Sequence, residues 1–143
     1  MAQLISCQME VLKIKGTNVS PEVNFDHVSM SFEMSGYSRP ENVRDFYMPL
    51  LTWLEEFVVE ITRNKPSISK PIAFNYRMIY FNSSSAKFLF DMITHINAIH
   101  KAKMPVMINW YFDEDDEELK EAGEELSEMA DFPFSYYEVK KSK

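Results

Sequence analysis

Apolar and polar residues alternate with recognisable periods along most of the chain, and these periods predict a series of strands and helices. The clearest strand period is in residues 25–35, where every second position from Val28 to Met34 is apolar. Residues 71–81 and 106–112 are more continuously apolar, which is typical of strands in the interior of a sheet. A first strand is predicted at 9–14, and residues 136–139 are a candidate edge strand.

The first helical segment follows the predicted strand at 25–35. Ser38 has a capping hydroxyl and is followed by Pro40 and Glu41, so a helix start is predicted there. An apolar stripe at helical spacing then extends to Ile61. Because Pro49 lies inside this stripe, we expect the helix to be kinked or divided at that point.

Two further helices are predicted. Residues 86–102 carry a second amphipathic stripe, and the acidic residues 113–128 carry a thin apolar seam at the same spacing. The strand–helix–strand unit at 71–112 implies a crossover between parallel strands. The predicted order is β-β-α-β-α-β-α, an α/β fold with a small mixed sheet, in a single domain covering residues 1–143.

Composition and charge exclude several classes of protein. The chain has 143 residues and a net charge of −7, which leaves no basic face for nucleic acid. Hydrophobic residues make up 45%, enough for a core, but no run approaches a membrane span. Cys7 is the single cysteine, so no intrachain disulfide is expected. A cytoplasmic protein without membrane insertion is the expectation.

Glycine is scarce, and this excludes most nucleotide-dependent enzymes. Only Gly16, Gly36 and Gly123 are present, far apart in the chain. Phosphate-cradling loops need several glycines within a few positions, because the backbone must approach the ligand closely. The glycine-flanked serine of hydrolases is absent for the same reason. No cofactor is expected.

The charge excess is concentrated in residues 113–128, which hold ten carboxylates and one lysine. The remaining chain carries 14 basic and 12 acidic residues and is nearly neutral. A calcium loop counted from Asp113 places Glu118 where the sharp turn requires glycine, so that interpretation fails. Two interpretations stay open: a solvated helix face, or a docking surface for a basic partner.

Histidine and cysteine give little support for catalysis. Asp91 and His95 are four residues apart on a predicted helix, but neither a nucleophile nor a metal-binding spacing accompanies them. His27 and His100 are interpreted as ordinary surface or core residues. Cys7 has no local basic neighbour to lower its pKa and is interpreted as inert. No metal site or catalytic residue is predicted, although a small enzyme using Asp91 or His95 remains an alternative.

The tetrad Asn82, Ser83, Ser84 and Ser85 lies where a buried strand is followed by an amphipathic helix. Asn and Ser are preferred at helix N-termini, since they satisfy backbone N–H groups that no carbonyl reaches. Simple capping is therefore one interpretation. The other is a phosphorylation switch, because a phosphate there gains from the N–H donors and the helix dipole and adds negative charge without melting the helix.

A strand followed by Asn-Ser-Ser-Ser and an amphipathic helix resembles the phosphorylated loop of anti-sigma-factor-antagonist (STAS-like) domains. Those domains usually carry Asp-Ser-Ser/Thr-Gly, so Asn82 and Ser85 depart from that pattern. The chain is more similar to the SiaC family of bacterial regulatory phosphoproteins over a core of about residues 19–134. The blocks that carry this similarity, in the family's order, are 21–26, Gly36 with Ser38 and 40–42, 46–50, 53–55, 80–85, 109–113, 123–125 and 132–134.

The resemblance implies a non-enzymatic partner-switching protein with a STAS-like fold. A dedicated Ser/Thr protein kinase would phosphorylate it and a PP2C-type phosphatase would reset it. In the unphosphorylated form it would bind and activate a diguanylate cyclase, in cyclic-di-GMP signalling that controls biofilm behaviour. The matching phosphorylation site is Ser83, with Ser84 as the fallback. Asn82, Ser84 and Ser85 shape its loop, and the four residues together are the expected partner-binding loop. An antagonist-like binding module with a different target is the alternative.

Overall fold

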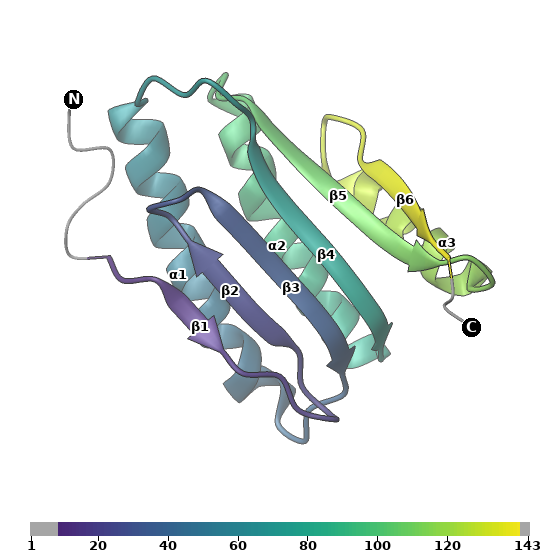
Figure 1. Cartoon of the computed structure of the whole chain (residues 1–143). Coiled ribbons are helices and arrows are strands. Elements are labelled where there is room, and N and C mark those ends of the chain that lie inside the picture. The colour runs from purple at the N-terminus through teal and green to yellow at the C-terminus, as the bar shows by residue number, and fades with distance from the viewer. Residues whose placement is uncertain (1–8, 141–143) are drawn as a thin grey trace.

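In residues 9–140, which the computed structural model describes, six strands form one sheet with three α-helices on one side (Figure 1). The strands are β1 (Leu12–Ile14), β2 (Glu22–Asp26), β3 (Ser31–Ser38), β4 (Ile72–Phe81), β5 (Val106–Asp113) and β6 (Ser135–Val139). The helices are α1 (Val43–Asn64), α2 (Ser83–Lys101) and α3 (Glu117–Leu126), and a short 3-10 turn, η1 (Ser127–Met129), follows α3.

The strands lie in the sheet in their chain order. β1, β2 and β3 are antiparallel neighbours, whereas β3, β4, β5 and β6 are parallel. Each parallel pair is joined by a helix, which is the connection that parallel strands require. The carboxyl ends of four strands therefore meet at one edge of the sheet. The α/β class with a small mixed sheet is confirmed.

The core lies between the sheet and the helices. Phe32 of β3 stacks on Phe74 of β4 with ring centroids 4.6 Å apart, and Trp53 stacks on Phe57 within α1 at 5.6 Å. Phe25 of β2 completes this aromatic cluster, 5.5 Å from Trp53. These rings are almost fully buried, so the apolar face of α1 seals one half of the sheet. None of the helices in residues 9–140 combines the length and apolar character needed to cross a bilayer.

The single strand predicted at 25–35 is wrong, because the chain reverses direction within it. β2 ends at Asp26 and β3 begins at Ser31, and the two pair as an antiparallel hairpin. Asp26 Oδ1 accepts hydrogen bonds from the N–H groups of Val28 (3.0 Å) and Ser29 (3.1 Å), which closes the turn. Donation by the Ser29 N–H also lowers the pKa of Asp26. The observed order is therefore β-β-β-α-β-α-β-α-β.

The helix start predicted at Ser38 is also wrong. Ser38 is the last residue of β3 and is fully buried, and α1 begins at Val43. The capping residue is Asn42, whose Oδ1 accepts a hydrogen bond from Asp45 N–H at 3.0 Å. α1 then runs through Pro49 as one helix, so it is not divided there. The other predicted elements, including the edge strand β6 and the acidic helix α3, are present.

Candidate functional site

The polar tetrad lies at the junction between β4 and α2, at the edge where parallel strands end. Asn82 has extended backbone angles (φ −87°, ψ 175°), and its Oδ1 accepts a hydrogen bond from Ser85 N–H at 3.0 Å. Its carbonyl accepts the first helical bond, from Ala86 N–H at 3.0 Å. The capping interpretation is thus confirmed for Asn82.

The loop is also tied to the neighbouring strand. The N–H of Asn82 donates to the carbonyl oxygen of Ser38, at the end of β3, over 3.1 Å. The hydroxyl of Ser85 donates to the same carbonyl over 3.0 Å. The end of β3 therefore fixes the start of α2 from two sides. A helix held in this way can present its first residues in one fixed orientation.

A buried chain of hydroxyl groups lies directly beneath the loop. Ser38 Oγ donates to Ser85 Oγ at 2.8 Å, so the hydroxyl of Tyr47, 2.5 Å from Ser38 Oγ, is left to donate to it. Ser85 closes the chain on the Ser38 carbonyl. Three elements, β3, α1 and α2, are joined by these side chains. The hydroxyl relay, as we call Ser38, Tyr47 and Ser85, is fully buried.

The relay stays neutral at ordinary pH. Burial raises the pKa of Tyr47 to about 12, although its hydrogen bonds with Ser38 and Ser85 oppose that shift. The Tyr47 ring stacks on Phe88 of α2 with centroids 5.3 Å apart, which further fixes it. The Tyr47 phenol therefore stays protonated, and a neutral hydroxyl is a poor general base. The role of the relay is to position the helix start, and Ser85 belongs to this support.

Ser83 and Ser84 differ from Ser85 in their exposure. Both are exposed and occupy the first two positions of α2, where backbone N–H groups have no partner within the helix. The first turn of α2 contains no acidic residue. A phosphate on either hydroxyl would lie in the positive field of the helix N-terminus, one turn before the exposed Lys87. The structure thus separates two accessible serines from one buried serine.

The described residues weighed for catalysis lie on α2 and at the hairpin between β2 and β3. Within residues 9–140, no three His, Cys, Asp or Glu side chains come together in a way that could hold a metal ion. Asp91 is exposed and His95 half-buried, and both lie on α2. His27 is buried at the hairpin, with its ring 5.8 Å from that of Trp53. Cys7 lies outside the described residues.

The acidic segment lies beside the same edge of the sheet. α3 is capped by Asp116, whose Oδ1 accepts from Leu119 N–H at 2.9 Å, and Trp110 Nε1 donates to the Leu119 carbonyl at 3.0 Å. Gly123 faces the Trp110 ring so closely that a Cβ would lie 2.5 Å from it. The first turn of α3 shares a surface recess with the end of β4, including Tyr80. The acidic helix therefore stands close to the tetrad.

Sequence reasoning missed two residues of this site. Ser38 was interpreted as a helix cap and Tyr47 as one member of an apolar stripe, yet both support the loop. Ser38 and Ser85 are 47 positions apart, and no local pattern links residues across such a distance. The buried hydroxyl of Tyr47 within an apolar stripe was the one available signal, since a buried phenol usually needs a hydrogen-bond partner.

Known proteins resemble this chain over nearly its whole length. Residues 14–139 match the model of the SiaC family of regulatory phosphoproteins. An uncharacterized protein of Pseudomonas aeruginosa (strain UCBPP-PA14) is 30% identical over 127 residues, covering 89% of this chain and 95% of that protein.

Solved structures from the same bacterium share the fold. SiaC of P. aeruginosa, from the crystal structure of the diguanylate cyclase SiaD in complex with its activator SiaC, has a TM-score of 0.78 at 28% identity, covering 90% of this chain and 99% of that one. Apo-SiaC has a TM-score of 0.75 at 27% identity, with the same coverage. The sequence blocks, the fold and the matched length agree: the chain belongs to the SiaC family of regulatory phosphoproteins.

Proposed function

We propose that this chain is a non-enzymatic switch protein of the bacterial cytoplasm that binds and activates a diguanylate cyclase in its unphosphorylated form. A Ser/Thr protein kinase adds phosphate to Ser83 and a PP2C-type phosphatase removes it. Ser84 is the alternative acceptor. The observation that carries the proposal is the division of the tetrad into exposed Ser83 and Ser84 and a buried, hydrogen-bonded Ser85.

The geometry supports Ser83, like Ser84, over Ser85 as the modified residue. Its hydroxyl is exposed at the first position of α2, directly after the Asn82 cap. A kinase must take hold of the hydroxyl from outside, which excludes Ser85 while the fold is intact. The cap and the relay hold the helix start rigid, so the modification changes surface charge while the backbone stays in place.

The charge of the phosphate explains why binding would be lost. A phosphoserine carries about −1.5 to −2 charges near neutral pH. A partner that covers Ser83 must remove water from that group, and a buried charge without a matching cation is strongly unfavourable. The similar P. aeruginosa SiaC is described as an activator of the cyclase SiaD, which supports a cyclase as the partner here.

The test compares charge at Ser83 with the same charge elsewhere. The purified full chain, Ser83→Asp and Ser83→Ala are titrated against diguanylate cyclases cloned from the host, and cyclic-di-GMP formation is measured. We expect Ser83→Ala to activate like the wild type and Ser83→Asp to bind at least about tenfold more weakly. Ser67→Asp is the matched control, because Ser67 is exposed in the loop before β4, at the opposite end of that strand.

Three results would overturn this assignment. Equal activation by Ser83→Asp and Ser83→Ala would remove the charge switch. Phosphate found by mass spectrometry only outside Ser83 and Ser84, in protein isolated from the native host, would move the site. Loss of activation in Ser67→Asp as well would show that net charge matters and position does not.

A further inference from the structure

The parallel sheet divides between β4 and β5 toward its carboxyl edge. Pairing of β4 with β5 stops at Tyr76 and Trp110, whereas β4 stays paired with β3 as far as Phe81. β5 likewise stays paired with β6 as far as Asp113, opposite Val139. The ends of β4 and β5 thus separate as each follows its outer neighbour, and Figure 1 shows this divergence.

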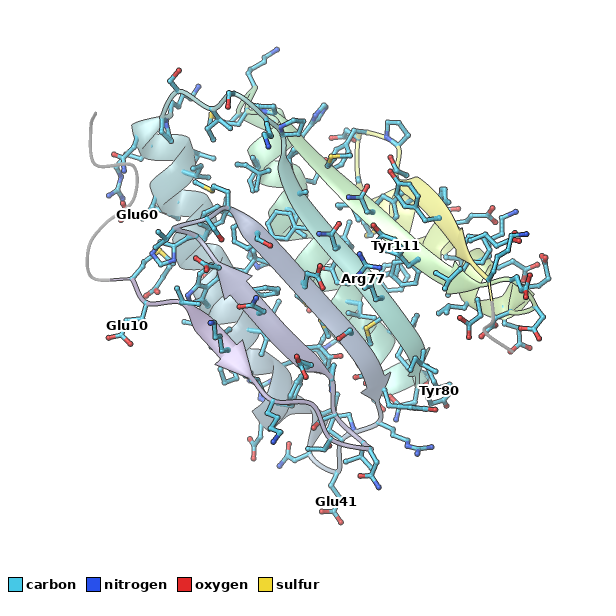
Figure 2. The ribbon with its side chains drawn as sticks, viewed as in Figure 1. Glu10, Glu41, Glu60, Arg77, Tyr80 and Tyr111 are labelled. Carbon is cyan, nitrogen blue, oxygen red and sulfur yellow. The ribbon has the colours of Figure 1, made fainter. Side chains whose placement is uncertain are left out.

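Side chains bridge the opening at two points and leave recesses beside it. On the uncovered face, the Arg77 guanidinium lies 3.8 Å from the centre of the Tyr111 ring, and Figure 2 shows the two together. On the helix side, Phe81 meets Trp110 edge to face at 6.1 Å. One recess lies between β4 and the ends of β5 and β6, and the other lies between the end of β4 and the first turn of α3. Ile79 lines both recesses.

The two recesses, which together we call the cleft, have apolar walls that are exposed to solvent. Ile79 is 49% exposed, Tyr80 47% and Val139 40%, although each belongs to a strand. Water-exposed apolar side chains that gather at one place are typical of protein contact surfaces. A partner side chain placed against Ile79 would remove apolar area from water on both surfaces. The cleft therefore favours an apolar anchor.

The rim of the cleft is acidic. Asp113 lines the first recess, and Asp116 and Glu118 line the second. Arg77 also lines the first recess, but its Nε lies 3.7 Å from Glu33 Oε1 and its guanidinium covers Tyr111. The carboxylates belong to the segment that holds ten of the chain's 22 acidic residues. An incoming segment with lysine or arginine beside its apolar anchor would complement this rim.

We propose that the cleft between the ends of β4 and β5 is a docking site for a basic segment of a partner protein, with one apolar side chain seated against Ile79. Ser83 follows Phe81, which lines the cleft, by two residues. A phosphate there adds negative charge near the acidic rim of the cleft. Docking of a basic segment is therefore kept or strengthened by phosphorylation, the opposite of the proposed cyclase response. The docking site itself does not depend on that proposed function, whereas its response to phosphorylation rests on it.

The experiment uses the full chain labelled with ¹⁵N and a synthetic peptide that has a single leucine between pairs of lysines. Amide shift changes are followed during titration by NMR. We expect them to centre on Ile79, Tyr111 and Val139, and binding to weaken by about tenfold when the peptide leucine is replaced by serine. Ser83→Asp should bind the peptide equally or more tightly.

Matched variants separate a built site from general charge attraction. Glu118→Lys should weaken binding, whereas Glu117→Lys should have much less effect, because Glu117 shares the first turn of α3 but does not line the cleft. Ile79→Ser should weaken binding, whereas Val28→Ser should not, since Val28 is 76% exposed in the hairpin turn.

Several outcomes would overturn the docking site. Shift changes spread along α3, with equal losses in Glu117→Lys and Glu118→Lys, would mean attraction to acidic charge alone. If Ile79→Ser bound the peptide as tightly as the wild type does, Ile79 would not be the contact for the apolar anchor. A concentration-dependent dimer in light scattering that Ile79→Ser abolishes would assign the cleft to a second copy of this chain. None of these readings involves a cyclase, so failure here and failure of the cyclase switch are distinguishable.

Discussion

At the residue scale, the three consecutive serines at the start of α2 divide into two roles because the helix places their side chains in different directions. The first two positions of α2 point to solvent, and the third turns inward to the relay. The difference follows from a rotation of about 100° per residue, since 3.6 residues make one turn. One helical turn therefore carries both the exposed hydroxyls of Ser83 and Ser84 and the buried hydroxyl of Ser85 that supports the loop.

The relay predicts a selective loss of stability in Ser85→Ala. That change leaves the Ser38 hydroxyl without its acceptor in a fully buried place, which costs about 1–3 kcal/mol. Ser84→Ala, in the same turn but exposed, should change the free energy of unfolding by less than about 0.5 kcal/mol. Urea unfolding of both variants measures the difference. Equal stability of the two would mean that the relay contributes nothing.

Sequence reasoning succeeded for the cap and failed for its support. Asn82 was predicted as a cap because the preference is local: an amide oxygen needs to reach an N–H three residues away. The burial of Ser85 depends on Ser38 and Tyr47, which come from two other elements. Residue types at a helix start specify the cap, whereas the partner of an inward hydroxyl is set by tertiary packing.

At the element scale, α3 is held to the sheet by a close approach that only glycine allows. Gly123 is buried against the Trp110 ring, and a Cβ there would lie within 2.5 Å of Cδ1 and Nε1. Trp110 is itself fully buried and cannot move aside. The position of the acidic helix beside the cleft thus depends on one missing methyl group.

Gly123→Ala should therefore destabilise the protein, against the usual rule for helices. Alanine in a helix interior is ordinarily favoured over glycine by about 1 kcal/mol. Here overpacking against Trp110 should exceed that gain and give a net loss of about 1–2 kcal/mol. Chemical unfolding followed by tryptophan fluorescence measures it. Glu124→Ala, at the exposed neighbour, is the control, and a more stable Gly123→Ala would refute the close contact.

The prediction of one strand at 25–35, where the structure has a hairpin, failed for a local reason. Alternation from Val28 to Met34 continues straight through the turn, and no glycine or proline marks the reversal. The chain turns on the Asp26 side chain, and Met30 adopts a left-handed conformation with φ 60°. An aspartate three residues before a serine was the available signal, but such a pair also occurs within strands and loops. Alternation of apolar and polar residues shows which side chains share a face of the sheet, but it does not show where the chain reverses direction.

At the scale of the whole molecule, the polar loop, the divided ends of β4 and β5, and the acidic helix all lie at one edge of the sheet. This follows from parallel strands β3 to β6, whose carboxyl ends point the same way. Fold class was predictable because strand and helix periods are properties of short segments. The division between β4 and β5 was not, because pairing partners are set by the twist of the whole sheet.

The proposed phosphorylation of Ser83 should alter this edge without disturbing the fold. Ser83→Asp places a carboxylate at the positive end of α2, whose first turn has no acidic residue, so the free energy of unfolding should stay equal or rise by about 0.3–1 kcal/mol. Ser85→Asp buries a charge and should unfold the chain or cost several kcal/mol. Thermal unfolding by circular dichroism compares them. A Ser83→Asp variant as unstable as Ser85→Asp would mean that phosphorylation acts by unfolding.

The hydroxyl relay also makes the loop insensitive to proton concentration. With the Tyr47 pKa at about 12 and serines that do not titrate, the groups that hold the helix start keep one protonation state from acid to mildly alkaline solution. A phosphate on Ser83 would titrate near pH 6, because the second pKa of a phosphoserine is about 6. Acidification would then weaken the signal by lowering the phosphate charge from about −2 to about −1, while the scaffold that displays it stays the same.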